Sequence, residues 1–421
     1  MLLGLSIENW LSFKEVTEFS MIATREQQHG ERLFKCKNRI LPISAIYGAN
    51  ASGKTNFIKI ISLAKVFILN GSRPDESLPF YPYLLDDECA KKPSKFSVGL
   101  LIDDKIFEYS FAANQKYVIE EKLSEVKTRE KVLFHRKNDE IIFDNNLPDM
   151  KFLEFIFKST RKNQLFLTSS VFQNANHFKK IYDWFYNIEI ITPDATFYAF
   201  EQFFDEKSSL YNEINNYFKS CDVGIDRIEC EEIPFSSLPI DNNSKTQLAG
   251  IPEGKTFKLR IGRERILISK KDGNILAKRM IAIHLNSKGE SVKFNLTNES
   301  DGTLRAMDLF PAFSELCNDT PKIYVIDEID RSLHPLLVRH LIEMYLDSCN
   351  NTKRGQLIFT THDTNLIDQN VFRRDEIWTI DRNKFGASKF VSFSDFKDIR
   401  YDLNIRKSYM DGRFGGVPNV G

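Results

Sequence analysis

The sequence predicts an α/β fold with a mixed sheet, a β-rich lobe, and a helical and β insertion in the middle of the chain. Residues 43–47 alternate like a strand and run through a glycine-rich turn into helical spacing over 57–68. Residues 93–143 alternate as strands and predict the β-rich lobe. From about residue 300 the chain alternates strand and helix, which indicates a parallel sheet.

The other elements follow from the same patterns. Residues 148–220 are predicted to be mainly helical around a short strand at 164–168, and residues 241–245 to form an exposed loop. Strands resume over 255–296, with a tight hairpin turn at 271–274. The remaining predicted elements are strands at 3–7, 16–21, 322–326 and 356–360, and a helix from Pro335 to about Cys349. The predicted domains are residues 1–147, 148–295 and 296–421.

Composition narrows the class of protein. The chain has 421 residues, 42% of them hydrophobic, and 58 basic against 58 acidic residues. This balance argues against a polyanion-binding surface over the whole chain. Six cysteines without CxxC spacing suggest neither a zinc ribbon nor a disulfide framework. The apolar run 60–69 is interrupted by Ser62 and Lys65, and the start of the chain lacks a signal-peptide pattern, so we expect a cytoplasmic protein without a membrane partner.

The stretch Gly48–Thr55, GANASGKT, matches the full pattern G-x-x-x-x-G-K-[ST]. Glycines allow the backbone to curl around phosphates, so that N–H groups at a helix N-terminus point at negative charge. Lys54 would reach the β- and γ-phosphates, and the Thr55 hydroxyl would bind Mg²⁺. The candidate nucleotide-binding residues are Gly48, Asn50, Ala51, Ser52, Gly53, Lys54, Thr55 and Asn56.

A buried strand at 323–326 ends in two acidic residues, Asp327 and Glu328. Asp327 would hold Mg²⁺, and Glu328 would orient and deprotonate the attacking water. The alternative is a nuclease-type metal cluster formed by these two residues and Asp330. The apolar strand before the acids and the phosphate loop upstream favour the first interpretation.

The segment Glu299–Arg305, ESDGTLR, precedes the acidic strand and opens a predicted helix. It resembles the signature of ABC-type ATPases, whose usual form is L-S-G-G-Q. Two of its residues match that form, Ser300 and Gly302, and three depart from it: Glu299, Asp301 and Thr303.

Four more segments carry a family resemblance. Asp330–Pro335 resembles the D-loop in the LHP form of the overcoming-lysogenization-defect class, and Phe359–Asp363 resembles the His switch. Glu8–Lys14 and Tyr409–Pro418 are similar to segments of standalone bacterial AAA/ABC-type ATPases of abortive-infection and anti-phage systems. That group includes the ATPase of PARIS and the AbiL-like proteins.

The resemblance implies a P-loop ABC-type ATPase head that uses ATP and Mg²⁺ and closes as a homodimer or higher homo-oligomer. Ser300 and Gly302 of one subunit would cap the γ-phosphate held by the other subunit. Glu328 and His362 would act in hydrolysis, His362 by contacting the γ-phosphate and reporting its loss. The glutamine that such enzymes place near Mg²⁺ would be Gln173, with Gln164 as the second choice.

The defence family implies a nucleotide-switched sensor or scaffold that controls a separately encoded effector, a nuclease or toxin, in response to a phage-derived trigger. The chain shows no HNH or HEPN-like pattern of its own. The alternative is a DNA-clamping repair or chromosome-maintenance ATPase similar to RecF. A third hypothesis is an ATPase subunit of a membrane transporter. The long insertion between the phosphate loop and the signature argues against it.

The alternative depends on a basic segment over residues 258–279, which could contact a phosphate backbone. A solvated hairpin face or an acidic protein partner would explain the same charges. Overall neutrality and the lack of a coiled-coil pattern favour the defence role. The cations of the segment are Lys258, Arg260, Arg263, Arg265, Lys270, Lys271, Lys278 and Arg279, against Glu264 and Asp272.

Overall fold

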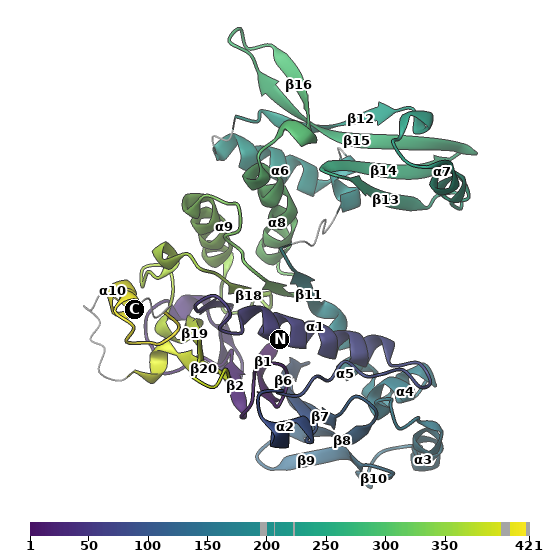
Figure 1. Cartoon of the computed structure of the whole chain (residues 1–421), viewed down its shortest axis with the longest axis vertical. Coiled ribbons are helices and arrows are strands. Elements are labelled where there is room, and N and C mark those ends of the chain that lie inside the picture. Colours follow the sequence, from purple (N-terminus) through teal and green to yellow (C-terminus); the bar gives the residue numbers. More distant parts are fainter. Residues whose placement is uncertain (194–199, 206, 222–223, 397–404, 418–421) are drawn as a thin grey trace. The chain divides into compact units, whose positions relative to one another are not determined.

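The computed structural model (Figure 1) describes residues 1–193, 200–205, 207–221, 224–396 and 405–417. Spatial grouping gives two compact units. Unit 1 comprises Met1–Pro193, Asp319–Asp330 and Glu343–Gly421, and unit 2 comprises Asp194–Asn318 and Arg331–Ile342. The domain boundaries predicted from sequence follow the chain rather than this grouping and remain predictions.

Unit 1 contains a six-stranded mixed sheet. Its strands, in spatial order, are β11 (Ile188–Ile191), β17 (Ile323–Ile326), β18 (Gln356–Thr360), β5 (Ile43–Tyr47), β19 (Ile377–Arg382) and β20 (Ser388–Ser392). The first five are parallel and β20 is antiparallel. Strands β5, β17 and β18 are buried throughout, as expected for the centre of a parallel sheet. The predicted strands at 43–47, 322–326 and 356–360 are therefore confirmed.

A second, antiparallel sheet of unit 1 forms the predicted β-rich lobe. Its strands, in order, are β10 (Glu140–Phe143), β9 (Glu130–Lys137), β8 (Val118–Val126), β7 (Lys105–Ala113), β6 (Ser94–Ile102), β1 (Leu2–Glu8) and β2 (Thr17–Ser20). Helix α1 (Lys54–Asn70) shares one hydrophobic core with residues of both sheets. A short pair, β3 (Phe34–Lys35) and β4 (Arg39–Ile40), completes the strands of the unit.

The smaller helices of unit 1 include one correction. They are α2 (Asp87–Ala90), α3 (Met150–Ser159), α4 (Phe166–Phe172), α5 (Lys179–Trp184) and α10 (Ile405–Met410). The strand predicted at 164–168 is wrong, because that segment starts α4. The buried carboxylate of Glu121, on β8, accepts hydrogen bonds from the backbone N–H groups of Phe166 and Leu167 at 2.6 and 2.9 Å. This distant residue satisfies the first turn of the helix, which local sequence alone does not reveal.

Unit 2 contains a five-stranded antiparallel sheet (Figure 1). Strands β12 (Arg227–Ile233), β15 (Asn274–Leu285), β14 (Glu264–Lys271) and β13 (Thr256–Ile261) follow in that order, and β16 (Ser291–Asn295) pairs with the end of β15. The predicted hairpin turn is confirmed between β14 and β15. Its central residues, Asp272 and Gly273, have φ values of 53° and 76°, which fit a tight two-residue turn.

The helices described for unit 2 include a second correction. They are α6 (Ser209–Ser220), α7 (Asn242–Ala249), α8 (Asp301–Cys317) and the part of α9 (Pro335–Ser348) up to Ile342. The loop predicted at 241–245 is wrong, since Asp241 caps α7 by accepting the Ser244 N–H at 2.9 Å. Among the described residues, no helix is both long and apolar enough to cross a membrane.

Nine short 3₁₀ turns complete the described elements, at Gly30–Arg32, Asn176–Phe178, Phe185–Asn187, Phe200–Phe204, Phe235–Ser237, Leu296–Asn298, Thr364–Leu366, Arg374–Glu376 and Phe393–Asp395. The order of strand, glycine-rich loop and helix, the mixed sheet, the β-rich lobe and the insertion before Ser300 all agree with the α/β fold class predicted from the sequence.

Candidate active site

Three sequence segments meet at one edge of the mixed sheet. The phosphate loop, Gly48–Thr55, follows β5, Asp327 and Glu328 follow β17, and His362 comes shortly after β18. Because β5, β17 and β18 are parallel, their carboxyl ends share one edge. The structure therefore brings together the phosphate loop, the acidic pair and the histidine within unit 1.

The phosphate loop is too tightly wound for side chains at its two glycines. A Cβ on Gly48 would lie 2.6 Å from both the Ile380 carbonyl oxygen and Ser52 Oγ. Gly53 has a φ of 119°, and a Cβ there would lie 2.9 Å from Ser12 Oγ. Ser52 Oγ is buried and has no hydrogen-bond partner among the described residues. This close cradle with an unsatisfied hydroxyl fits a bound phosphate.

The Lys54 side chain is only 6% exposed and folds back onto this loop. Its Nζ donates to the carbonyl oxygens of Gly48 at 2.6 Å and Ala49 at 3.0 Å. Desolvation lowers the pKa of Lys54 from 10.5 to about 8, and three nearby carboxylates act in the opposite direction. They belong to Asp327, Glu328 and Asp330. Phosphate oxygens beside Nζ would stabilise its charged form further.

The other loop residues differ in exposure. Thr55, at the start of α1, is exposed, as are Asn50 and Ala51, and Asn56 is half-buried. Ala51 has a φ of 61°, which fits the sharp turn of the loop. The exposed positions are accessible to a ligand at the mouth of the loop.

The acidic pair is fixed by a threonine from the neighbouring strand. Asp327 is 2% exposed and its Oδ1 accepts a hydrogen bond from Thr360 Oγ1 at 2.6 Å. The same Oγ1 accepts the backbone N–H of Glu328 at 2.8 Å. Glu328 has a φ of 48°, an unusual backbone conformation for a glutamate and one that is common at functional sites. The backbone therefore turns at Glu328, immediately after Asp327 and the end of β17.

The alternative of a nuclease-type metal cluster receives no support. Within the described ranges, no group of three or more His, Cys, Asp or Glu side chains is placed to hold a metal ion. Thr55 and Asp327 remain the candidate Mg²⁺ ligands, beside the phosphate cradle.

His362 lies at the same sheet edge, and its backbone N–H donates to Asp330 Oδ2 at 3.3 Å. Partial desolvation and the positive charge of Lys54 lower the pKa of His362 below 6.5. The imidazole is therefore mainly neutral at pH 7. Asp330 Oδ1, Asp363 Oδ2 and the hydroxyl of Tyr47 are buried without hydrogen-bond partners among the described residues. Polar atoms left unsatisfied beside a candidate site are what a ligand or its water would occupy.

The structure does not bring either predicted glutamine to the phosphate loop. Gln164 Oε1 accepts the Ser72 N–H at 3.1 Å, just beyond the C-terminal end of α1. Lys54 lies at the opposite end of this 17-residue helix, about 25 Å away at 1.5 Å per residue. Gln173 ends α4 and exchanges hydrogen bonds with Ser159 on α3. Because α4 also packs on the far end of α1, through Thr168 and the Ile68 carbonyl, the sequence-based choice of Gln173 is corrected here.

The signature-like residues belong to unit 2. Ser300 caps α8, and its Oγ accepts the Thr303 N–H at 3.1 Å. A Cβ on Gly302 would lie 2.6 Å from the Ser332 carbonyl oxygen, so the D-loop-like segment touches the signature turn. The predicted helix start at this motif is therefore correct.

Sequence reasoning missed several residues around the phosphate loop. Ser388, on β20, donates its hydroxyl to the Ser52 carbonyl and its N–H to the Ser12 carbonyl, the latter at 2.8 Å. Arg382 Nη1 donates to the Ala51 carbonyl at 3.5 Å. No motif marks Ser388 or Arg382. Only Ser12 lies in a segment, Glu8–Lys14, that the sequence had singled out.

The C-terminal motif also supports the phosphate loop. Thr379 Oγ1 donates to the Phe414 carbonyl at 2.9 Å, and the Tyr409 hydroxyl donates to the Gly416 carbonyl at 3.1 Å. A Cβ on Gly416 would lie 3.4 Å from Gly48 Cα. Gly416 thus lies against the first residue of the loop, whereas Pro418 of the same motif lies outside the described residues.

Gly416→Ala is expected to weaken nucleotide binding about tenfold, because its new methyl group would press on Gly48. Gly412→Ala is the matched control. Both glycines have positive φ values, 71° and 78°, but a Cβ on Gly412 meets nothing within 4 Å. Both variants carry similar backbone strain, of about 1 kcal/mol. Titration with a fluorescent ATP analogue measures the difference, and equal affinities for the two variants would contradict this role of the C-terminal segment.

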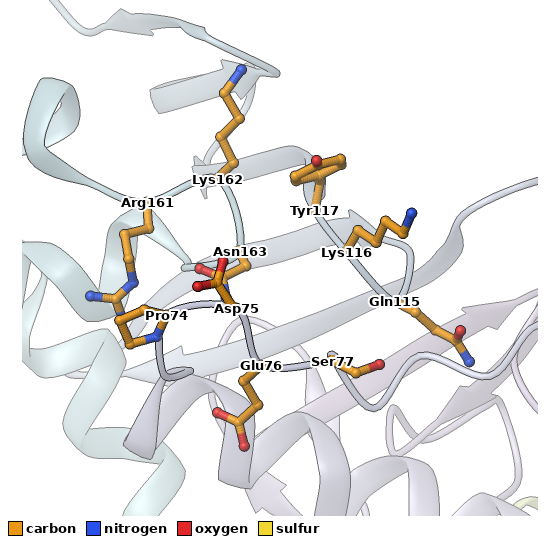
Figure 2. Close-up of a pocket in the computed structure, with 10 residues that line it drawn as sticks. All are labelled: Pro74, Asp75, Glu76, Ser77, Gln115, Lys116, Tyr117, Arg161, Lys162 and Asn163. Carbon is orange, nitrogen blue, oxygen red and sulfur yellow. The ribbon is translucent and has the colours of Figure 1, made fainter.

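A separate polar pocket of about 640 Å³ lies at the other end of α1 (Figure 2). It is lined by Pro74, Asp75, Glu76, Ser77, Gln115, Lys116, Tyr117, Arg161, Lys162 and Asn163. Its lining includes three cations and two carboxylates, and Lys162 pairs with Asp139 at 2.7 Å. The pocket contains none of the motif residues, so it is not part of the candidate active site.

One sequence family matches residues 43–368, well over half of the chain. It is described as "AAA domain, putative AbiEii toxin, Type IV TA system". No curated protein matches the chain.

Three solved structures are similar at low identity. One is an SmcHead bound to the C-winged helix domain of ScpA, with 14% identity, 93% of this chain and 97% of that chain covered, and a TM-score of 0.41. Another is the SMC head domain from Thermotoga maritima, with 14% identity, coverage of 93% and 98%, and a TM-score of 0.33. The third, an Smc head domain with an extended coiled coil bound to the C-terminal domain of ScpA derived from Pyrococcus furiosus, has 12% identity, coverage of 98% for both chains and a TM-score of 0.41. Such low values carry no information about function.

Proposed function

Because the chain belongs to this AAA domain family, we propose that it is an ABC-type ATPase whose nucleotide state controls a separately encoded effector in an anti-phage system. The observation that carries the proposal is the meeting of three strand ends in unit 1. They join a complete phosphate loop, an acidic pair and a histidine at one sheet edge.

Each residue has a proposed role in ATP hydrolysis. Backbone N–H groups of Gly48–Thr55 and the ammonium group of Lys54 bind the phosphates. Thr55 and Asp327 would hold Mg²⁺, which neutralises phosphate charge when bound. Glu328 orients the attacking water and accepts its proton. His362, being mainly neutral, can donate or accept a hydrogen bond at the γ-phosphate.

We further propose that two copies of the chain share each nucleotide. The signature-like Ser300 and Gly302 of one copy would meet the triphosphate held by Lys54 of the other. The N-terminus of the 17-residue helix α8 would place its backbone N–H groups near negative charge. Hydrolysis removes the γ-phosphate that both copies bind and so loosens the pair.

The proposed defence role draws on the family description, which names a putative toxin of a Type IV TA system, and the proposed separate effector draws on the chain's own sequence. The sequence shows no nuclease pattern beside its ATPase motifs, so a separate protein would carry out the toxic step. A phage-derived signal would act through the ATP-bound pair. We expect the chain to assemble as a homodimer or as a higher homo-oligomer that contains such pairs.

The DNA-clamping alternative depends on the basic segment of unit 2, and part of that charge is neutralised. At least four of the eight cations over 258–279 have carboxylate partners among the described residues, which neutralise part of the basic segment. These pairs are Arg263 with Asp301, Arg265 with Asp308, Lys278 with Glu232, and Arg279 with Glu231. Lys270 and Lys271 have no ion pair among the described residues.

The proposal is tested by purifying the tagged chain from cells that co-express its genomic neighbour. We expect the neighbour's product to co-purify, and more of it to remain bound with ATP than with ADP. Recovery of nucleic acid in place of that protein, reduced steeply by salt, would favour the alternative. Absence of both would argue against an effector-controlling role.

A further inference from the structure

The signature turn, residues 299–303, is fastened to the β-sheet of unit 2. The three residues that depart from the L-S-G-G-Q form all have hydrogen-bonded side chains. Glu299 Oε1 pairs with His284 Nε2 at 2.8 Å, Asp301 Oδ1 accepts from Arg263 Nη2 at 2.6 Å, and Thr303 Oγ1 lies 2.9 Å from Ser300 Oγ. Each departure from the L-S-G-G-Q form therefore makes a contact within the chain.

Arg263 spans the turn on both sides of Ser300. It lies in the turn between β13 and β14, and its Nη1 donates to the Glu299 carbonyl at 3.0 Å while Nη2 reaches Asp301. A guanidinium group is planar and rigid, so it sets the spacing between the two groups that it binds. This contact fixes the backbone immediately before and after the capping serine.

His284 and Arg265 hold the turn from two further positions on the same sheet. Glu299 is 8% exposed, and the His284 ring that binds it packs edge-on against Phe294 at 4.7 Å between ring centroids. Arg265, on β14, donates to Asp308 at 2.8 Å and to the Leu304 carbonyl at 3.3 Å, one turn into α8. Strands β14 and β15 therefore both contact the start of α8.

We propose that Arg263 and His284 are positioning residues that preset the signature turn for the triphosphate bound by the other copy. This inference rests on the proposed function, because it assumes that Ser300 and the helix N-terminus act on that triphosphate. A turn already held in the binding geometry avoids the entropy cost of ordering it on pairing. The sheet of unit 2 thereby gains a direct influence on the paired state, through two side chains that do not touch nucleotide.

Because the side chains of Arg263 and Asp301 are exposed, the effect of Arg263 on the position of the turn can be measured apart from its effect on folding stability. The Arg263 side chain is 43% exposed and the Asp301 side chain 66% exposed. Exposed ion pairs contribute little to folding stability, so Arg263→Ala should fold normally. A small displacement of a binding group can nevertheless lower activity by a large factor.

The experiment compares Arg263→Ala with wild type and with Arg279→Ala. Arg279 is also on the unit 2 sheet, pairs with Glu231 at 2.8 Å and lies 3.9 Å from Glu264, and it has no described contact with the signature turn itself. Three quantities are measured: hydrogen exchange of residues 299–304 without nucleotide, affinity of the monomer for a fluorescent ATP analogue, and ATP-dependent pairing by sedimentation. Pairing is measured in chains that also carry Glu328→Gln.

For Arg263→Ala we expect faster exchange at the signature turn, unchanged nucleotide affinity, and pairing weakened about tenfold or more. Arg263→Lys should restore part of the pairing, and Arg279→Ala should match wild type. His284→Ala should behave like Arg263→Ala, and His284→Gln, which keeps a donor, should be milder.

Unchanged exchange, or faster exchange with normal pairing, would overturn the inference while leaving the proposed function intact. Equal loss of pairing in Arg279→Ala would also overturn it, since that result indicates a general disturbance of the sheet. If the wild-type chain shows no ATP-dependent pairing, the proposed function itself fails, and the inference falls with it.

Discussion

Lys54→Ala is expected to weaken nucleotide binding by about one to two orders of magnitude. A hydrogen bond to a charged group contributes about 1.5–3 kcal/mol, so losing the ammonium group should weaken binding by about 10- to 150-fold. Burial already lowers the pKa of Lys54 to about 8, which means that the charged form destabilises the folded chain at pH 7. Alanine should therefore leave folding stability intact or raise it. Titration with a fluorescent ATP analogue and thermal unfolding provide the two measurements.

Lys59→Ala is the matched control for this variant, because Lys59 lies on the same helix with an exposed side chain. It should bind nucleotide like wild type. Mixing two inactive variants tests whether two copies of the chain share one nucleotide site. Subunits with Lys54→Ala and subunits with Ser300→Glu should each be inactive alone, and together should recover part of the ATPase activity. Wild-type affinity in Lys54→Ala would contradict the phosphate-loop role, and lack of recovery on mixing would contradict sharing between copies.

Glu328→Gln is expected to keep nucleotide binding and to lose hydrolysis by at least about 100-fold, the usual contribution of a general base. Glutamine has nearly the same shape as glutamate but cannot accept the proton of the attacking water. ATP should then accumulate in a stable paired state. Phosphate release gives the rate, and light scattering with ATP and Mg²⁺ gives the mass of the complex.

Glu154→Gln serves as the control, because Glu154 is an exposed glutamate on α3, away from the acidic strand. Its phosphate release should equal that of wild type. Normal hydrolysis in Glu328→Gln would rule out the base role of Glu328. Lost hydrolysis without pairing would retain that role and reject the nucleotide-dependent closure.

Local patterns were sufficient to predict the centre of unit 1. Strands β5, β17 and β18 are mainly apolar because they are buried throughout, and such runs are easy to identify in sequence. The phosphate loop is likewise a contiguous motif whose glycines are required by close packing at Gly48 and Gly53. The placement of Asp327 and His362 at one edge then follows from the parallel topology.

The wrong predictions concern features set by distant residues. Helix α4 begins where Glu121 satisfies two N–H groups, and a residue more than forty positions away leaves no trace in local hydrophobic spacing. Gln173 was selected by its position in sequence, whereas the packing of α4 on α1 determines its surroundings. The role of the basic segment remains a prediction from its own charges, and Glu231 and Asp308, which neutralise part of it, come from β12 and α8.

The hydroxyl of Thr360 couples the end of β18 to the end of β17. One oxygen joins the candidate Mg²⁺ ligand to the backbone of the candidate base, donating to Asp327 and accepting from Glu328. A shift of β18 along β17 would displace both acids together. A change in metal binding at Asp327 would therefore accompany a change in proton transfer at Glu328. Valine would fill the same space at position 360 and yet break this link, because the site requires a hydroxyl there that donates one hydrogen bond and accepts another.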